Sequence, residues 1–255
     1  MQIANHTFLI SGGCSGLGRA CVERFHGAGA NVVIADLNET TGRELTQRLG
    51  PRSLFAQVDV TDAASVQTAL DSAVKSFGGL HGVVHCAGIL AAARLLGKNG
   101  PHDWELFRRV IEVNLMGTFN VFRLAAAALE KNPPTTDGER GVLIATSSVA
   151  AEDGQIGQAG YAASKAGVSG LMLPLARELA RCGIRAVAIA PGVFETAMMT
   201  SAPTAVRDSL AAQIPFPPRL GQPDEFAALA QQIVENTYLN GTTIRLDGGL
   251  RMGAK

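Results

Sequence analysis

The sequence predicts an α/β fold built on one doubly wound parallel sheet. Short apolar runs recur along the chain, and each is followed by a longer segment whose apolar residues repeat at helical spacing. The apolar runs lack strict polar alternation, which is typical of strands buried on both faces of a parallel sheet. A glycine-rich segment follows the first run, where such a fold turns sharply from strand into helix.

The predicted elements alternate from the first run onward. We expect a strand at residues 7–10, a helix at 18–29, a second strand at 31–35 and a second helix at 40–49. Further strands, with helices between them, are predicted at residues 53–58, 82–86, 141–146, 185–190 and 242–246. The last strand continues the same series, and no Pro/Ser-rich linker divides the 255 residues. One domain is therefore expected over residues 1–255.

Three stretches break this alternation, at residues 91–103, 132–140 and 197–219. The third is rich in proline, with Pro203 and Pro215 among four such residues. Irregular segments of this length in a compact domain are commonly functional. We therefore predict a substrate lid at about residues 197–219.

Composition narrows the classes of function. The 22 basic and 22 acidic residues give zero net charge, which disfavours nucleic acid as a partner. The four cysteines form no C-x-x-C pair, so neither a metal site nor a disulfide framework is expected. The chain enters an apolar stretch at residues 8–10 without a targeting segment, and no apolar run is long enough to span a membrane. These features predict a cytoplasmic protein with no membrane partner.

The glycine-rich segment runs from Ser11 to Gly18 with the sequence SGGCSGLG. Glycines at a strand-to-helix turn let backbone N–H groups approach a phosphate closely. A Walker-type phosphate loop is excluded because Arg19 and Ala20 stand where that loop needs Lys and Ser or Thr. A hydrolase elbow is excluded because no serine lies in a G-x-S-x-G frame. A dinucleotide site of the Rossmann type remains, with a tight turn that binds no ligand as its alternative.

Asp36 ends the second predicted strand, 18 residues beyond Gly18. A carboxylate there can accept hydrogen bonds from an adenosine ribose, and it repels a 2′-phosphate. Neither Ser15 nor Leu37 and Asn38 supplies a cation for that phosphate. The pattern favours NAD over NADP, and the alternative is that Asp36 only caps the next turn.

Tyr161 and Lys165 are four residues apart in a small-residue, helix-compatible segment, so they share one helix face. Lowering a tyrosine pKa by about 3 requires roughly 4 kcal/mol, which an ammonium about 4 Å away supplies at an effective dielectric near 20. Such a tyrosine can exchange a proton with an alcohol or ketone during hydride transfer. Ser148 follows a buried strand thirteen residues upstream and can hold the substrate oxygen. The alternatives are a solvated helix face for the pair and backbone capping for Ser148.

Taken together, these residues resemble the short-chain dehydrogenase/reductase family over essentially the whole chain. Cys86-Ala87-Gly88 is similar to the family's Asn-Ala-Gly turn, with cysteine in place of asparagine. The resemblance implies catalytic roles for Ser148, Tyr161, Lys165 and Asn114, the last completing a proton relay through water, and substrate contacts from Ser148, Gln158 and Tyr161. The cofactor contacts that it implies are Gly12, Ser15, Gly16, Leu17, Gly18, Asp36, Leu37, Asp59, Val60, Cys86, Ala87, Gly88, Tyr161, Lys165, Pro191, Gly192, Phe194 and Thr196.

A closer similarity exists to family members that oxidise 3-hydroxyacyl-CoA thioesters with NAD, accept some hydroxysteroids and form homotetramers. It lies in residues 114–121, 188–192, 215–217, 219–221 and 244–248. The resemblance implies the same reaction on an acyl-CoA thioester and a homotetramer for this chain. The animal members of that group are mitochondrial, but the N-terminal extension that they carry is lacking here, so a cytoplasmic location is expected. Acyl chain length is not predicted.

Several alternatives stay open. The enzyme could be a 3-oxoacyl reductase that uses a carrier-protein thioester, or a hydroxysteroid dehydrogenase, and the chain could instead be an NAD-binding structural subunit. Asp59 either contacts adenine or caps the helix near Thr61. Arg94 and Lys98 either contact coenzyme A phosphates or belong to a solvated loop.

Overall fold

The protein is built around a seven-stranded parallel sheet, which confirms the predicted fold class. The computed structural model describes residues 1–98, 100–196, 199 and 204–254. The strand order is β3-β2-β1-β4-β7-β8-β9, and every neighbouring pair is parallel. The strands are β1 (Thr7–Ser11), β2 (Asn31–Asp36), β3 (Ser53–Gln57), β4 (Gly82–His85), β7 (Gly141–Thr146), β8 (Ile184–Pro191) and β9 (Thr243–Leu246). Each predicted strand is found within two residues of its expected bounds.

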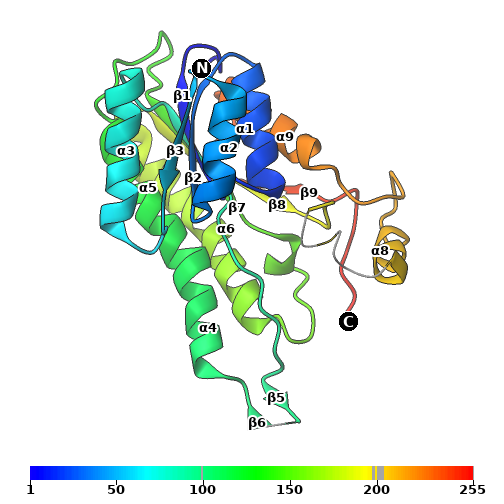
Figure 1. Cartoon of the computed structure of the whole chain (residues 1–255). Coiled ribbons are helices and arrows are strands. Elements are labelled where there is room, and N and C mark those ends of the chain that lie inside the picture. The colour runs from blue at the N-terminus through cyan, green and yellow to red at the C-terminus, as the bar shows by residue number, and fades with distance from the viewer. Residues whose placement is uncertain (99, 197–198, 200–203, 255) are drawn as a thin grey trace.

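Helices cover both faces of the sheet (Figure 1). One face carries α1 (Gly16–Gly27), α2 (Glu39–Leu49) and α9 (Pro223–Glu235). The other carries α3 (Ala63–Phe77), α5 (Gly117–Leu129) and α6 (Ala159–Leu179). The remaining elements are α4 (Trp104–Ile111), α8 (Thr204–Ala211), the short helices η1 (Glu112–Met116), η2 (Val149–Ala151) and η3 (Ala180–Cys182), and the hairpin of β5 (Leu96–Gly97) and β6 (Gly100–Pro101). Helix α4 and this hairpin project beyond the sheet (Figure 1).

Alternate residues of each strand enter two separate apolar cores. In β1, Leu9 belongs to the core under α3, α5 and α6, whereas Phe8 and Ile10 belong to the core under α1 and α9. All three side chains are essentially inaccessible to solvent. Each such burial contributes roughly 1.5–3 kcal/mol. Burial on both faces explains why the strands show apolar runs in place of polar alternation.

The strand order creates a crevice at the carboxyl ends of the strands. The chain runs from β1 to β2 on one side, whereas β4 pairs with the opposite side of β1. Connections therefore leave the carboxyl ends of β1 and β4 in opposite directions, and ligands bind at such switch points in open α/β sheets. The segments that carry the predicted site residues leave the sheet at these carboxyl ends.

The predicted lid is only partly described. Residues 197–198 and 200–203 lie outside the described residues. The described part contains α8, so this stretch is not irregular throughout. After α8, Ile214 and Leu220 pack with Leu250 in a small apolar cluster. This cluster joins the segment to the C-terminal residues.

Candidate active site

A cavity of about 670 Å³ lies at the carboxyl ends of the strands. Its lining includes all but one of the predicted site residues, although they are scattered over most of the sequence. These are Gly12, Ser15, Gly16, Leu17, Gly18, Asp36, Leu37, Asp59, Val60, Cys86, Ala87, Gly88, Ser148, Gln158, Tyr161, Lys165, Pro191, Gly192, Phe194 and Thr196. The exception is Asn114. The fold therefore brings the predicted set together, and the size suits a small-molecule site.

The glycine loop has no room for side chains at several positions, of which Gly12 and Gly18 show it clearly. Gly12 has a φ of +64°, and a Cβ there would lie 2.9 Å from the backbone nitrogen of Ala87. A Cβ on Gly18 would lie 2.2 Å from the carbonyl oxygen of Gly12. The loop is thus packed backbone against backbone, and it leads directly into α1, whose first turn carries unpaired N–H groups. This arrangement fits the phosphates of a dinucleotide.

Asp36 is held at the cavity wall by two backbone donors. Its Oδ2 accepts from the N–H of Cys14 at 3.0 Å, and its Oδ1 accepts from the N–H of Asn38 at 3.0 Å. The helix that follows is capped by Asn38, whose side chain accepts from the N–H of Thr41. Asp36 therefore stabilises the turn without capping α2, and its remaining lone pairs are available to ribose hydroxyls.

Asp59 lies beside Val60 in the cavity lining, and its carboxylate caps the backbone of the turn at Thr61. Its carboxylate accepts from the backbone and the hydroxyl of Thr61, and these bonds hold its pKa below the usual value, with Arg109 contributing less. Helix α3 itself is capped by Asp62. Arg109, on α4, lines the same cavity and was not predicted from the sequence. No motif marks it, because only the tertiary fold brings α4 to the β3 loop.

Tyr161 and Lys165 lie on α6, with the Lys165 Nζ 5.8 Å from the centre of the tyrosine ring. Lys165 is buried, and its Nζ donates to the carbonyl oxygen of Thr146 at 2.7 Å. Burial lowers the pKa of Lys165 from 10.5 to about 8. Burial also raises the pKa of Tyr161, while the nearby Ser148 hydroxyl acts in the opposite direction.

The lowered tyrosine pKa expected from Lys165 alone is therefore not found in this structure. The physical reason is that loss of water penalises the phenolate, whereas the ammonium is committed to the Thr146 carbonyl. Ser148 also has its predicted alternative role, because its Oγ accepts from the N–H of Ala150 at the start of η2. Even so, Ser148 and Tyr161 line one cavity and interact with each other.

Asn114 lies behind the cavity wall, in the π-helical turn η1 between α4 and α5. Its side chain accepts from the N–H of Ile89 at 2.8 Å and donates to the Ile89 carbonyl at 2.9 Å and to Ser164 at 3.0 Å. A Cβ on Gly88 would lie 3.1 Å from the Asn114 Oδ1 and 3.4 Å from the Lys165 Nζ. Asn114 therefore fixes the segment after the Cys-Ala-Gly turn against α6. Local π-helical turns are frequent at functional sites.

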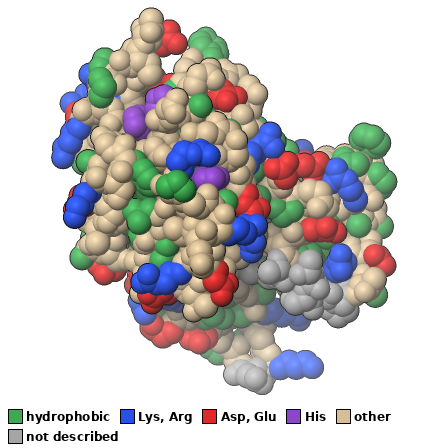
Figure 2. Space-filling view, turned by 45° about the horizontal axis from the view of Figure 1, so that its top comes forward, with side chains coloured by type: hydrophobic (Ala, Val, Ile, Leu, Met, Phe, Trp, Pro, Cys, Tyr) green, Lys and Arg blue, Asp and Glu red, His purple; other side chains and the backbone are tan. Residues whose placement is uncertain are grey.

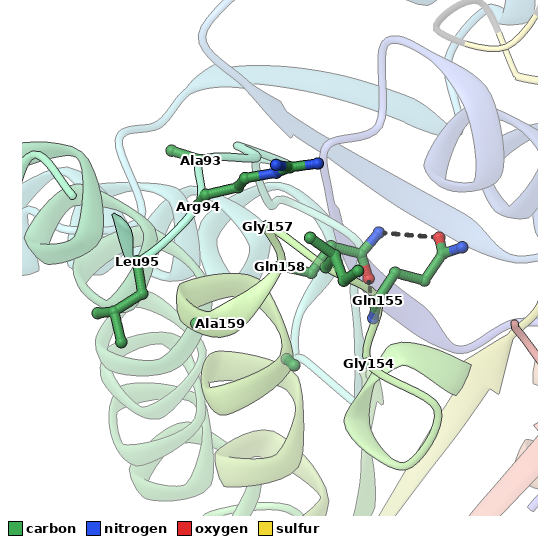
Figure 3. Close-up of a pocket in the computed structure, with 10 residues that line it drawn as sticks. Ala93, Arg94, Leu95, Gly154, Gln155, Gly157, Gln158 and Ala159 are labelled. Atoms are coloured by element: carbon green, nitrogen blue, oxygen red, sulfur yellow. Dashed lines mark hydrogen bonds between the residues drawn. The ribbon is translucent and has the colours of Figure 1, made fainter. Parts of the chain in front are cut away.

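A second opening of about 590 Å³ adjoins the cavity and shares Gln155 and Gln158 with it. Figure 3 shows the side chain of Arg94 on one side of this groove and the hydrogen-bonded pair of glutamines on the other. The groove is lined by Ala93, Arg94, Leu95, Gly154, Gln155, Ile156, Gly157, Gln158, Ala159 and Ala162. The sequence marked Gln158 but not Gln155.

The C-terminal segment forms another wall that no motif predicted. Met252 lines the cavity, and its N–H donates to Asp153. The N–H of Ile156 donates to the carbonyl of Ala254 at 3.0 Å. Asp153 also forms an ion pair with Arg245 at 2.7 Å. Residues near the end of the chain thus fix the loop that carries Gln155.

Two other kinds of site, a membrane span and a metal centre, are not found among the residues that the structure describes. Within the described ranges, no helix is long and apolar enough to cross a membrane. The same residues contain no group of three or more His, Cys, Asp or Glu side chains placed to hold a metal ion. On the face shown in Figure 2, acidic and basic side chains are interspersed.

Comparisons with known proteins agree with this architecture. The model of a family described as Enoyl-(Acyl carrier protein) reductase matches residues 12–251. The chain is 51% identical over 253 residues to the 3-hydroxyacyl-CoA dehydrogenase type-2 of Drosophila melanogaster, covering 98% of this chain and 99% of that protein. It is also 51% identical over 246 residues to the protein of that name from Homo sapiens, covering 96% of this chain and 94% of that protein.

A solved structure shares the whole fold. The crystal structure of 3-hydroxyacyl-CoA dehydrogenase type-2 from Mycobacterium avium has a TM-score of 0.95 and 42% sequence identity, and the match covers 100% of each chain. Sequence and fold therefore agree over nearly the full length. This chain belongs to the short-chain dehydrogenase/reductase family and is an oxidoreductase.

Proposed function

We propose that the protein interconverts 3-hydroxyacyl-CoA and 3-oxoacyl-CoA thioesters with NAD. The observation that carries this proposal is the shared cavity, in which the Tyr161, Ser148 and Lys165 set and the glycine loop with Asp36 meet. The names of the relatives supply the substrate class, since those from Drosophila melanogaster and Homo sapiens are 3-hydroxyacyl-CoA dehydrogenases.

The chain's own residues perform the proton chemistry. The Tyr161 phenol donates a proton to the ketone oxygen, or accepts one from the alcohol, while Ser148 donates a hydrogen bond to the same oxygen. When bound, the nicotinamide supplies the hydride acceptor or donor. The buried ammonium of Lys165 stabilises negative charge on Tyr161 as the proton leaves, and Asn114 orders the wall through which we propose that water reaches Lys165.

Burial of Tyr161 bears on the direction of proton transfer. Because burial raises its pKa, the phenol remains protonated at neutral pH and is ready to act as an acid toward a ketone. Oxidation of the alcohol instead needs Tyr161 as a phenolate that can accept the proton. Additional positive charge in the cavity stabilises this phenolate. The pH dependence of oxidation should therefore be steeper than that of reduction between pH 7 and 9.

We propose NAD as the cofactor because Asp36 presents a carboxylate to the adenosine end of the cavity. Among the described residues that line the cavity, Arg109 and Lys165 are the basic ones, and Lys165 is already bonded to Thr146. Asp36→Ala removes the repulsion of a 2′-phosphate, so the ratio of kcat/KM for NAD to that for NADP should fall at least tenfold, or about 1.4 kcal/mol. An unchanged ratio would show that Asp36 does not select the cofactor.

The decisive test is oxidation of 3-hydroxyacyl-CoA thioesters of increasing chain length, followed by NADH absorbance. Tyr161→Phe should lower kcat by about 10² to 10⁴, because the acid/base group is lost, while the Kd for NAD stays the same. Tyr238→Phe is the matched control, since that tyrosine is 97% exposed and does not line the cavity. A fully active Tyr161→Phe variant would refute the mechanism.

The alternatives predict different results in the same assay. Turnover of a hydroxysteroid, with none of any 3-hydroxyacyl-CoA, would overturn the substrate assignment. Preference for a carrier-protein thioester and NADPH would indicate a biosynthetic 3-oxoacyl reductase. NAD binding without turnover of any alcohol would leave the structural-subunit alternative.

We also propose a homotetramer. Exposed apolar side chains occur on η1, α5 and α6, with Met116 at 61%, Phe119 at 46% and Leu173 at 47% of full exposure. Contact with a second copy would remove this apolar surface from water. Light scattering coupled to gel filtration measures the mass, and a monomer of 26.5 kDa would refute the proposal.

A further inference from the structure

The groove beside the cavity has walls that are fixed before any ligand binds. On one side, the N–H of Ala93 donates to the carbonyl of Gly157 at 2.9 Å. On the other, Gln155 donates to the carbonyl of Gly253 at 3.3 Å, and Ile156 bonds to Ala254. Two segments far apart in sequence, residues 93–95 and 154–159, are therefore held face to face (Figure 3).

The groove carries fewer large apolar side chains than the cavity. Val193, Met199, Leu210 and Met252 are among the many that line the cavity but not the groove, whereas the groove has Leu95 and Ile156. At the junction of the two spaces lie the amides of Gln155 and Gln158, which offer donors and acceptors to a polar chain. Small side chains, Ala93, Ala159 and Ala162, form much of the groove wall and leave space between them.

Arg94 brings a positive charge to this groove. Its guanidinium makes no ion pair or hydrogen bond to any residue in the part of the chain that the structure describes, whereas fourteen ion pairs there engage an arginine side chain. Among the described residues, no Asp or Glu lines the groove. A free guanidinium above amides and small residues suits a flexible amide-bearing chain that ends in an anion.

We propose that the groove binds the phosphopantetheine arm of the thioester substrate, with Arg94 contacting its phosphate. The acyl chain then occupies the apolar part of the cavity near Val193, Met199 and Leu210, which line the cavity but not the groove. Gln155 and Gln158 bind the amides of the arm next to the thioester. This inference rests on the proposed function and adds the position of each half of the substrate.

The test compares three thioesters of one 3-hydroxyacyl group. The first carries coenzyme A, the second carries pantetheine without phosphate, and the third carries N-acetylcysteamine, which ends after one amide. Arg94→Ala should raise KM about tenfold for the coenzyme A thioester and leave the ratio of the other two KM values as in the wild type. Arg94→Lys should retain most of the affinity, because the charge remains. Raising the salt concentration should reduce the difference between wild type and Arg94→Ala, since an exposed pair is screened.

A carrier protein presents the same phosphopantetheine group, so a carrier-protein thioester is added to the series. If Arg94→Ala weakens it and the coenzyme A thioester alike, the phosphate that they share is the contact. Arg48→Ala is the control, because Arg48 is an exposed arginine of α2 that lines neither space. The proposal is overturned if Arg94→Ala raises KM equally for all the thioesters or for none. Failure of the proposed function is a different result, because the wild type would then turn over none of the thioesters. Turnover of the N-acetylcysteamine thioester by the wild type shows that the function holds even if the groove proposal fails.

Discussion

Lys165→Met should make the protein more stable at neutral pH while it abolishes catalysis. Lys165 is buried, and burial lowers its pKa from 10.5 to about 8. At pH 7 the side chain is therefore charged in a place that disfavours charge. Methionine has a similar length and no charge, so the substitution removes this penalty with little change in packing.

The size of the effect follows from the two pKa values. A fall from 10.5 to about 8, at about 1.4 kcal/mol for each pKa unit, corresponds to roughly 3 kcal/mol of destabilisation at pH 7. The variant also loses the hydrogen bond from Lys165 to the Thr146 carbonyl, which costs about 1–2 kcal/mol. The net expectation is a gain of about 1–2 kcal/mol in the free energy of unfolding.

The dependence on pH gives the sharper test. The folded state releases its proton near pH 8 and the unfolded state near pH 10.5, so the unfolded state binds more protons between these values. The free energy of unfolding of the wild type therefore rises with pH between about 8 and 10.5 because of Lys165. The Lys165→Met variant lacks this rise. The two stability curves should cross between pH 8 and 10.5, with the variant less stable above the crossing.

Urea denaturation at equal protein concentration, at pH 7 and pH 10, measures the stability difference between wild type and variant and its change with pH. Lys75→Met is the control, because Lys75 is exposed on α3 and its replacement should shift neither curve. A variant that is less stable than the wild type at pH 7, with the same difference at pH 10, would refute the claim that burial penalises the charge.

Three further substitutions test other parts of the structure. Gly18→Ala should raise the Kd for NAD at least tenfold, measured by fluorescence titration, because its methyl group has no room in the loop; wild-type affinity would contradict the packing. Arg109→Ala should weaken binding of ADP-ribose but not of nicotinamide mononucleotide, and Arg108→Ala, which does not line the cavity, should weaken neither. Arg185→Ala should lower the free energy of unfolding by about 3 kcal/mol in denaturant titration, since it leaves the buried Glu139 without this partner; a loss below 0.5 kcal/mol would show that the pair contributes little.

The strands and the cavity lining could be predicted because each leaves a local signal. Runs such as residues 32–35 are apolar throughout, and the pattern holds because both faces are buried. Gly18 and Asp36 have fixed places in a strand–turn–helix–strand unit, so their position along the chain predicts their position in space. The same argument applies to Tyr161 and Lys165, which share one helix face.

Other features depend on contacts that no local pattern records. The sequence predicted a lowered pKa for Tyr161, but desolvation depends on everything packed around it, and burial raises the pKa in this structure. The π-helical turn at Asn114 is likewise set by bonds to Ile89 and Ser164. Met252 lines the cavity only because the chain returns past β9 to the loop after η2.

That return of the C-terminal segment has an evolutionary consequence. The glycine loop, Asp36 and Asp59 follow β1, β2 and β3, whereas Met252, Asp153 and Arg245 form another part of the site through contacts that involve none of those loops. Substitutions among these three residues can alter which alcohol fits while the hydride-transfer residues stay unchanged. Substrate range in such a protein can thus diverge by drift at the end of the chain, with the redox chemistry inherited intact.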